Sequence, residues 1–292
     1  TLSSPGRYVA LLTIEGSIVD GESSRPPIKP PLPIPILMGP RAGDLSVVQA
    51  ARKALKDKRA AAVVLYVNSG GGSATSSEAM RAALEKISAE KPLIVSMGPV
   101  AASGGYWVSM PGRHIMAQPG TITGSIGVLM GKIVTGGMLD KLLFGRETIS
   151  RGKHALIDHT EEPFSEEARS IILDSINRVY EIFLDIVSEC RGLSREDVDA
   201  IGKGRVWTGR QALENGLVDE LGGLDRALSK AREIAGLHER ASVRMILPDK
   251  RHLPPVPSPT AALDYALEGA RLFRWGSALL LSPWEWSNFE DK

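Results

Sequence analysis

The chain has 292 residues, of which 43% are hydrophobic and 24% charged, with 35 Lys and Arg against 34 Asp and Glu. The resulting net charge of +1 argues against a nucleic-acid or strongly acidic partner, and the composition is typical of a soluble globular protein. The sequence contains no run of about 18 apolar residues of the kind that crosses a bilayer, so we expect the chain to be soluble and any membrane anchor to lie outside it.

Three apolar runs predict strands of a buried, mainly parallel sheet: residues 8–14, 61–67 and 92–97. Helical periodicity separates them. The first helix is predicted to begin at Asp44 as its N-cap, and the second at a capping box formed by Thr75 and Glu78. Strand, helix, strand, helix, strand indicates stacked βαβ units, an α/β fold whose functional loops leave the carboxyl ends of the strands.

The first half also contains a proline-rich segment, residues 25–40, which favours an extended polyproline II loop. We interpret it as a surface loop, with a cover for a neighbouring subunit or for the site as the alternative.

The second half is predicted to be mostly helical. We expect a short helix over 137–143, a strand over 147–150 and a long helix over 165–190, then a capping box from Thr208 to Gln211 and a last helix after Gly222-Gly223. The single cysteine, Cys190, is expected to be a small buried side chain in the long helix. His and Cys residues lack metal-ligand spacing, so we expect no metal and no cofactor.

The C-terminal tail is proline-rich from 247, with Thr260 as the expected N-cap of a helix. An apolar end with two Trp residues follows at 278–286. A membrane interface suits such a segment. Its acidic neighbours favour docking on the same protein instead.

Two small-residue turns carry the chemistry. Ser103 follows a predicted strand, flanked by Ala102, Gly104 and Gly105, and these small neighbours give a nucleophile the clearance that it needs. The upstream run Asn68-Ser69-Gly70-Gly71-Gly72-Ser73 offers free backbone N–H groups at a helix start, as an oxyanion hole requires. Each turn alone is also typical of an ordinary βα connection.

These turns and the run Pro119–Val128 together resemble the signal peptide peptidase A family of serine–lysine proteases, over about residues 8 to 235. The resemblance implies a Clp-protease/crotonase fold, Ser103 as nucleophile and Ser125 as the hydroxyl that orients a catalytic lysine. Gly71, Gly72 and Gly104 are the expected oxyanion donors. Gly70 stands where the family usually has proline, which should loosen the turn.

The resemblance also implies a peptidase domain over residues 1–240, including the 25–40 loop, and a linker with a helical tail over 241–292.

The general base departs from the family pattern. A G-x-x-K motif would place the lysine three residues after Gly152, where this chain has Ala155, and Lys153 stands two residues earlier. Lys153 in a shifted register is one explanation. A second is that this chain resembles the serine-bearing carboxyl-terminal half of a double-length member, with the lysine supplied by the other half or by another subunit. A third is a non-catalytic relative.

The leading hypothesis is a membrane-associated serine endopeptidase that cleaves signal peptides or other short hydrophobic peptides through an acyl-enzyme. Its expected partners are peptide substrates and either further copies of the chain or a missing homologous half. The alternatives are a non-catalytic assembly subunit and a crotonase-type acyl-CoA enzyme. A Ser-His-Asp triad using His114, His154 or His159 is the alternative mechanism.

Overall fold

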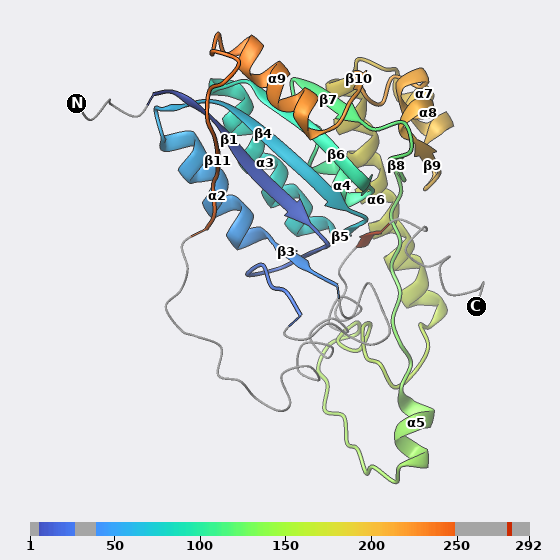
Figure 1. Cartoon of the computed structure of the whole chain (residues 1–292). Helices are drawn as coiled ribbons and strands as arrows, with labels where there is room; N and C mark the ends of the chain where they lie inside the picture. Colours follow the sequence, from blue (N-terminus) through green and yellow to red (C-terminus); the bar gives the residue numbers. More distant parts are fainter. Residues whose placement is uncertain (1–5, 27–38, 249–278, 282–292) are drawn as a thin grey trace.

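The computed structural model describes residues 6–26, 39–248 and 279–281. Its centre is a sheet in which six strands are parallel neighbours in the order β10-β7-β6-β4-β1-β11 (Figure 1). The strand bounds are β1 Tyr8–Glu15, β4 Ala60–Ser69, β6 Leu93–Ala102, β7 His114–Ala117, β10 Glu220–Leu221 and β11 Val243–Met245. Two further strands extend it, β8 (Ile122–Gly124) beside β6 and β9 (Val206–Thr208) antiparallel to β8.

The central sheet is buried on both faces, as its nearly continuous apolar strands require. On one face Leu12, Val63 and Val95 pack in the large core with α2 (Asp44–Lys56) and α3 (Ala74–Glu90). Val9 and Val64 point to the opposite face, where α9 (Leu224–Ile234) covers them (Figure 1). The α/β fold with a mainly parallel sheet is therefore confirmed. Strands β1 and β4 contain the first two predicted runs, and β6 contains all of the third except its first residue, Pro92.

A second, smaller sheet lies at the carboxyl ends of the central strands, in the order β12-β5-β2-β3. It consists of β2 (Ser17–Val19), β3 (Arg41–Gly43), β5 (Gly71–Ser73) and β12 (Leu279–Leu281). The glycine run after β4 thus forms a strand of its own, and a segment from the end of the chain pairs with it.

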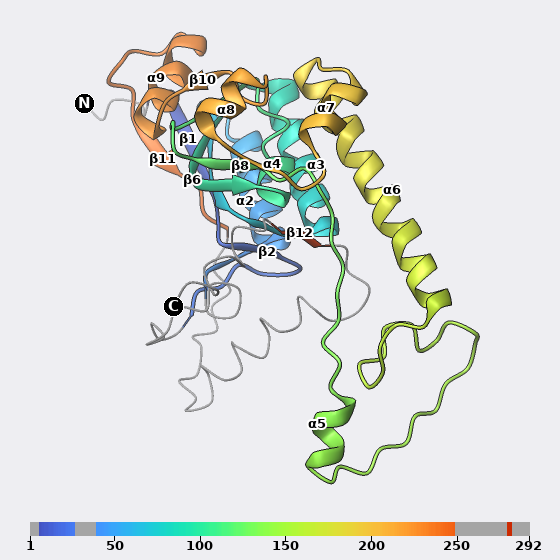
Figure 2. The same ribbon diagram turned by 90° about the vertical axis from the view of Figure 1, so that its right-hand side faces the viewer.

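The helical part begins with an arm of residues 129–165 that extends away from the sheet and carries α5 (Gly136–Lys141) at its far end (Figure 2). The chain returns through α6 (Glu166–Arg191), then α7 (Arg195–Ile201) and α8 (Gly209–Glu214). Several large apolar side chains of the arm are exposed, with Leu143 at 91% and Ile149 at 93%. The described part of the chain contains no helix with the length and apolarity that a membrane span requires.

Two of the predicted helix N-caps were wrong, and one was confirmed. Helix α2 has Gly43 as its N-cap, and the Asp44 carboxylate accepts the Gly21 N–H instead. Ser73 caps α3, two residues before the predicted Thr75. The capping box at Thr208 is confirmed.

Two further expectations of the helical half were wrong. Residues 147–150 form no strand, because none of the described strands lies beside this part of the arm. Cys190 lies on the same side of α6 as Phe183 and Val187, yet it is exposed because the burial of that side ends at Val187, before the last turn of the helix. The tail helix after Thr260 and most of the 25–40 loop lie outside the described residues, and the division into two domains stays a prediction.

Candidate functional site

Ser103 stands at the end of β6 in a backbone conformation that few residues adopt. Its φ is 53° and its ψ is −117°, and it serves as the N-cap of the short helix α4 (Gly104–Trp107). Non-glycine residues rarely occupy positive φ, and the strain of doing so, roughly 1–3 kcal/mol, concentrates at functional sites. The side chain is fully buried, yet its Oγ has no hydrogen-bond partner among the described residues. The turn therefore presents an unengaged hydroxyl.

Glycines allow the turn to contact the neighbouring strand β5. A Cβ on Gly104 would lie 3.1 Å from Gly71 Cα and 3.3 Å from Gly72 N, and one on Gly105 would lie 2.3 Å from the Ser69 carbonyl oxygen. The structure thus brings the two glycine turns together, as their places at the carboxyl ends of adjacent parallel strands predict.

The backbone of β5 lies close to the Ser103 turn, but the N–H of one predicted oxyanion donor, Gly71, already makes a hydrogen bond within the chain. The Gly71 N–H donates to Ser69 Oγ over 3.1 Å. Gly72 has a φ of 152°, and its nitrogen would lie 3.3 Å from a Cβ on Gly104. Both Gly71 and Gly72 therefore lie close to Gly104, the third predicted oxyanion residue.

A carboxylate that the sequence analysis did not single out fixes strand β5. Asp20 Oδ1 accepts a hydrogen bond from Ser73 Oγ over 2.9 Å and a second from Ser76 Oγ. Ser73 is the last residue of β5 and caps α3, so Asp20 ties the end of β2 to the turn that carries the glycines. Asp20 and Ser73 are more than fifty residues apart in the sequence, so a local sequence pattern could not have predicted their contact.

Ser125 lies beside Ser103 through strand register. Ala102 pairs with Gly124, so the two serines follow paired residues on β6 and β8, and the Ser103 N–H donates to the Gly124 carbonyl over 2.9 Å. Ser125 is also buried, with φ 48°, and its N–H donates to the backbone carbonyl of Arg205 over 2.7 Å. Two serines at positive φ therefore stand at one end of the sheet.

Lys153 lies in the arm, in surroundings unlike those of a general base. Its side chain is 72% exposed, and Nζ forms an ion pair of 2.6 Å with Glu167 in the first turn of α6. It lines a cavity of about 330 Å³ whose walls come from residues 132–168 and include neither Ser103 nor Ser125. A base must be buried and neutral to take a serine proton, and Lys153 is neither buried nor free of a carboxylate.

Lys132 is a second lysine of the same cavity, and the sequence analysis did not consider it. Burial lowers the pKa of its ammonium, although Asp158 and Glu162 act in the opposite direction. Nζ donates to the carbonyl of His159 over 2.8 Å and lies 4.2 Å from the centre of the Phe164 ring. These contacts engage the ammonium within the arm.

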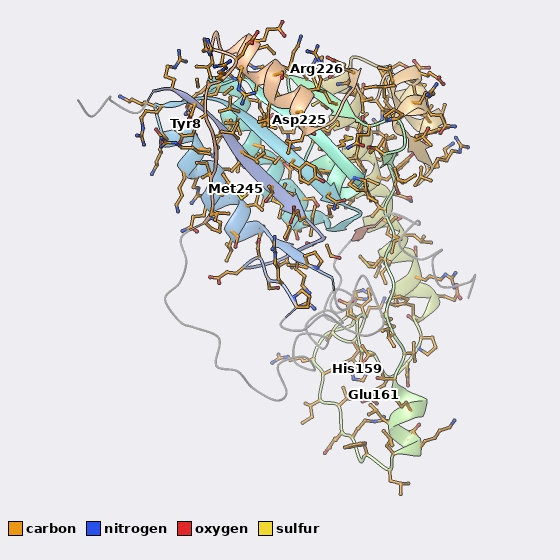
Figure 3. The ribbon with its side chains drawn as sticks, in the orientation of Figure 1. Tyr8, His159, Glu161, Asp225, Arg226 and Met245 are labelled. Carbon is orange, nitrogen blue, oxygen red and sulfur yellow. The ribbon has the colours of Figure 1, made fainter. Side chains whose placement is uncertain are left out.

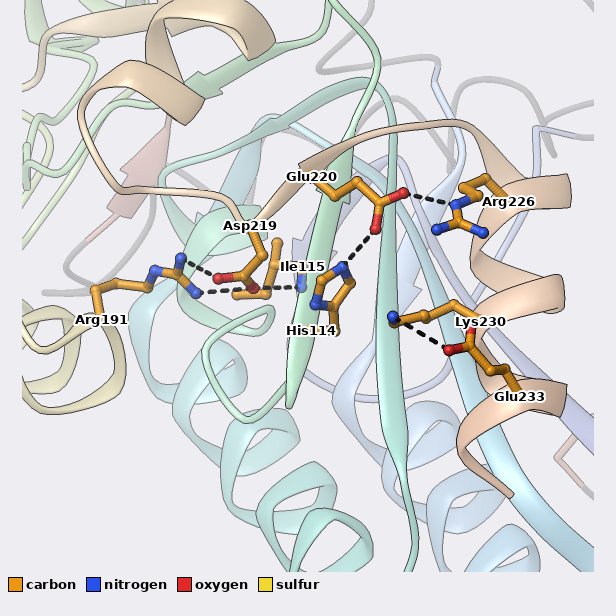
Figure 4. Close-up of polar contacts among 8 residues, drawn as sticks. All are labelled: His114, Ile115, Arg191, Asp219, Glu220, Arg226, Lys230 and Glu233. Carbon is orange, nitrogen blue, oxygen red and sulfur yellow. Dashed lines mark hydrogen bonds and ion pairs between the residues drawn. The ribbon is translucent and has the colours of Figure 1, made fainter. Parts of the chain in front are cut away.

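No histidine among the described residues hydrogen-bonds to Ser103. His114 Nε2 pairs with Glu220 over 2.9 Å, and Glu220 also accepts from Arg226 (Figure 4). His159 lies in the arm near Glu161, well away from the sheet (Figure 3). His154 lines the arm cavity. The triad alternative has no support in this geometry.

The mainly parallel sheet, with the buried Ser103 turn set against the glycine strand β5, is of the Clp-protease/crotonase-like fold class. The model of peptidase family S49 matches residues 85–238, which include both serines and Lys153. The chain belongs to this family, and its predicted resemblance to the signal peptide peptidase A family is thereby confirmed.

Similar proteins include two called "Protease 4". The one from Haemophilus influenzae is 36% identical over 237 residues, 81% of this chain and 36% of the relative. The one from Salmonella typhi is 35% identical over 294 residues, 93% of this chain and 45% of the relative. "Serine protease SPPA, chloroplastic" from Arabidopsis thaliana is 34% identical over 201 residues, 68% of this chain and 30% of the relative. The chain thus spans less than half the length of these three relatives.

Proposed function

We propose that this chain carries the nucleophile of a serine endopeptidase that cleaves signal peptides or other short hydrophobic peptides. The observation that carries the proposal is the Ser103 turn. There a buried hydroxyl, without a hydrogen-bond partner in the described part of the chain, stands at positive φ against the Gly71-Gly72 backbone. Family membership supports the peptidase activity, and the names of the relatives support a protease.

In the proposed reaction, Ser103 Oγ attacks the carbonyl carbon of the scissile peptide bond while a neutral lysine amine takes its proton. The carbonyl oxygen becomes an oxyanion and accepts hydrogen bonds from the N–H groups of Gly72 and Gly104, which stabilise it. Gly71 joins them only after releasing Ser69. The lysine then donates the proton to the leaving amine, and water hydrolyses the acyl-enzyme by the same route.

The lysine is proposed to come from another homologous half or from another subunit. Three facts support this source: the exposure of Lys153, its ion pair with Glu167, and the separate cavity in which Lys153 and Lys132 lie. The length of the relatives is consistent with a further unit. In this proposal Ser125 orients the incoming amine, since the β6–β8 register holds it next to Ser103.

A fluorophosphonate probe tests the nucleophile, because the probe forms a covalent bond only with an activated hydroxyl. We expect labelling of Ser103 in the full-length protein, located by mass spectrometry, and loss of both labelling and peptide cleavage in Ser103→Ala. Ser96→Ala is the matched control, since Ser96 is another fully buried serine of β6 without a hydrogen-bond partner among the described residues. A full-length protein that stays unlabelled at Ser103 would instead support the non-catalytic assembly subunit.

A further inference from the structure

A tryptophan of the short helix α4 makes a side-chain hydrogen bond that the proposed reaction does not use. Ser103 is the N-cap of α4, and Trp107, the last residue of that helix, donates its backbone N–H to the Ser103 carbonyl over 2.9 Å. Trp107 is only 2% exposed, and its side-chain Nε1–H donates to Glu78 Oε2 over 2.9 Å. A single residue therefore connects the proposed nucleophile to the carboxylate of Glu78.

Glu78 belongs to α3, the helix that follows the glycine strand. Ser73 ends β5 and caps α3, and Glu78 lies just after the first turn of that helix. The same part of α3 contacts the start of α4, since a Cβ on Gly104 would lie 2.7 Å from Ser77 Oγ. The bond from Trp107 to Glu78 thus joins the helix that begins at the glycine strand to the helix that begins at the nucleophile.

Arg81 holds the Glu78 carboxylate in a fixed orientation. Its Nε donates to Glu78 Oε2 over 2.7 Å and its Nη2 to Oε1 over 2.8 Å, a bidentate arrangement that restrains both oxygens. Burial raises the pKa of the Glu78 carboxyl, but the hydrogen bonds from Arg81 and Trp107 outweigh it, so the pKa lies below its usual value. An ionised and oriented carboxylate therefore accepts the indole N–H.

The contacts of Trp107 fix the direction in which α4 leaves the Ser103 turn. The indole ring packs against the Phe183 ring of α6, with 4.6 Å between the ring centroids and 51° between the ring planes. The hydrogen bond to Glu78 adds a directional restraint, because an N–H donor must point at its acceptor. Ser103 has a backbone conformation that persists only where the surrounding structure holds it, and α4 follows it directly.

We propose that Glu78 is a positioning residue of the Ser103 site: through Trp107 it fixes α4, and with it the Ser103 turn, against the β5–α3 turn that carries Gly72. The inference rests on the proposed function for its catalytic consequence. A displacement of about 1 Å costs a reacting group on the order of a hundred-fold in rate. Glu78 acts on the turn and not on the substrate, so its loss should lower kcat and leave KM within about twofold.

Four variants of the full-length protein separate this contact from a general effect on the fold. Glu78→Ala removes the acceptor, Glu78→Gln keeps an amide oxygen for the indole N–H, and Trp107→Phe removes the donor but keeps an aromatic ring. Glu85→Gln is the matched control. Glu85 is another carboxylate of α3 that pairs with Arg81, over 3.3 Å, and its side chain is 62% exposed.

Two readouts are measured on each variant: the rate at which the fluorophosphonate probe labels Ser103, and the hydrogen exchange of residues 103–108 by mass spectrometry. We expect Glu78→Ala and Trp107→Phe each to label at least about tenfold more slowly and to exchange faster in this segment. Glu78→Gln should recover most of the labelling rate, and the control should match the natural protein. Glu78→Ala combined with Trp107→Phe should label no more slowly than the slower single variant, because both remove one interaction.

Labelling of Glu78→Ala within about twofold of the natural rate, with unchanged exchange, would overturn the inference and leave the nucleophile in place. Losses that multiply in the combined variant would also overturn it, since they would show that the two residues act separately. Faster exchange in Glu78→Ala, with recovery in Glu78→Gln but no labelling of Ser103 in any protein, would support the positioning contact and contradict the proposed catalysis.

Discussion

Ser103 is expected to lower the stability of the fold, so replacing it should raise the melting temperature while removing activity. Two separate penalties act at this position. The hydroxyl is buried without a partner among the described residues, and the backbone holds a non-glycine residue at φ 53°. Ser103→Ala removes the first penalty, and Ser103→Gly removes both.

The magnitudes follow from the geometry. A buried polar group without a partner costs about 1–3 kcal/mol, so Ser103→Ala should gain about 1 kcal/mol or more. Relief of backbone strain adds about 1–3 kcal/mol for Ser103→Gly, from which the entropy of glycine subtracts roughly 0.5–1 kcal/mol. For a chain of 292 residues, an unfolding entropy of about 2.1 cal/mol/K per residue converts 1 kcal/mol into roughly 2 °C. We expect increases of about 2 °C for Ser103→Ala and about 4 °C for Ser103→Gly.

Calorimetric melting of both variants, with Ser96 as the matched position, separates the two effects. Ser96 also has a buried hydroxyl without a partner in the described structure, but it lies in the middle of β6 and is not among the residues at positive φ. Ser96→Ala should therefore gain about as much as Ser103→Ala, whereas Ser96→Gly should melt roughly 1–2 °C below Ser96→Ala because glycine weakens a strand. If Ser103→Gly melted at or below Ser103→Ala, the strain assigned to this turn would be refuted.

Three further outcomes are expected. Lys153→Ala should change the kcat/KM of the full-length peptidase by less than about threefold, since its Nζ is exposed and paired with Glu167; a loss of about a hundred-fold or more would identify Lys153 as the general base. Ser125→Ala should lower kcat by up to about a hundred-fold with little change in KM, and an unchanged kcat would make its turn purely structural. Asp20→Ala should lower the probe-labelling rate at Ser103 and should lower the melting temperature by about 2 °C. Asp20→Asn retains an acceptor for the Ser73 hydroxyl and should recover most of the labelling rate. Equal labelling rates in the two variants would contradict a positioning role for Asp20.

Much of the fold could be predicted from the sequence because the relevant signals are local. Continuous apolar runs identify strands buried on both faces, and the three runs correspond to β1, β4 and β6, with only Pro92 outside its strand. The alternation of strands and helices fixes a parallel sheet, and a parallel sheet places the turns after successive strands at one edge. The meeting of the Ser103 turn with Gly71 and Gly72 follows from that order alone.

Errors arose where two residue types offer the same local chemistry. Thr75 and Ser73 are both able to cap a helix. The structure has Ser73 as the N-cap of α3, and the Ser73 hydroxyl also donates to Asp20, a contact that the local sequence does not reveal. Residues 147–150 have strand-like composition, yet a strand forms only where a neighbour supplies hydrogen bonds.

The sequence by itself determined the α/β class, the serine turn and the break in the lysine motif, because each depends on residues that are close along the chain. Only the tertiary structure decided that Lys153 pairs with Glu167, that Ser125 stands beside Ser103, that Asp20 holds strand β5, and that residues 279–281 take its free edge. Each of these contacts joins segments through strand register or through the path of a long connection. Strand register and the path of a connecting segment depend on how the whole core packs, so neither can be predicted from a local pattern of residues.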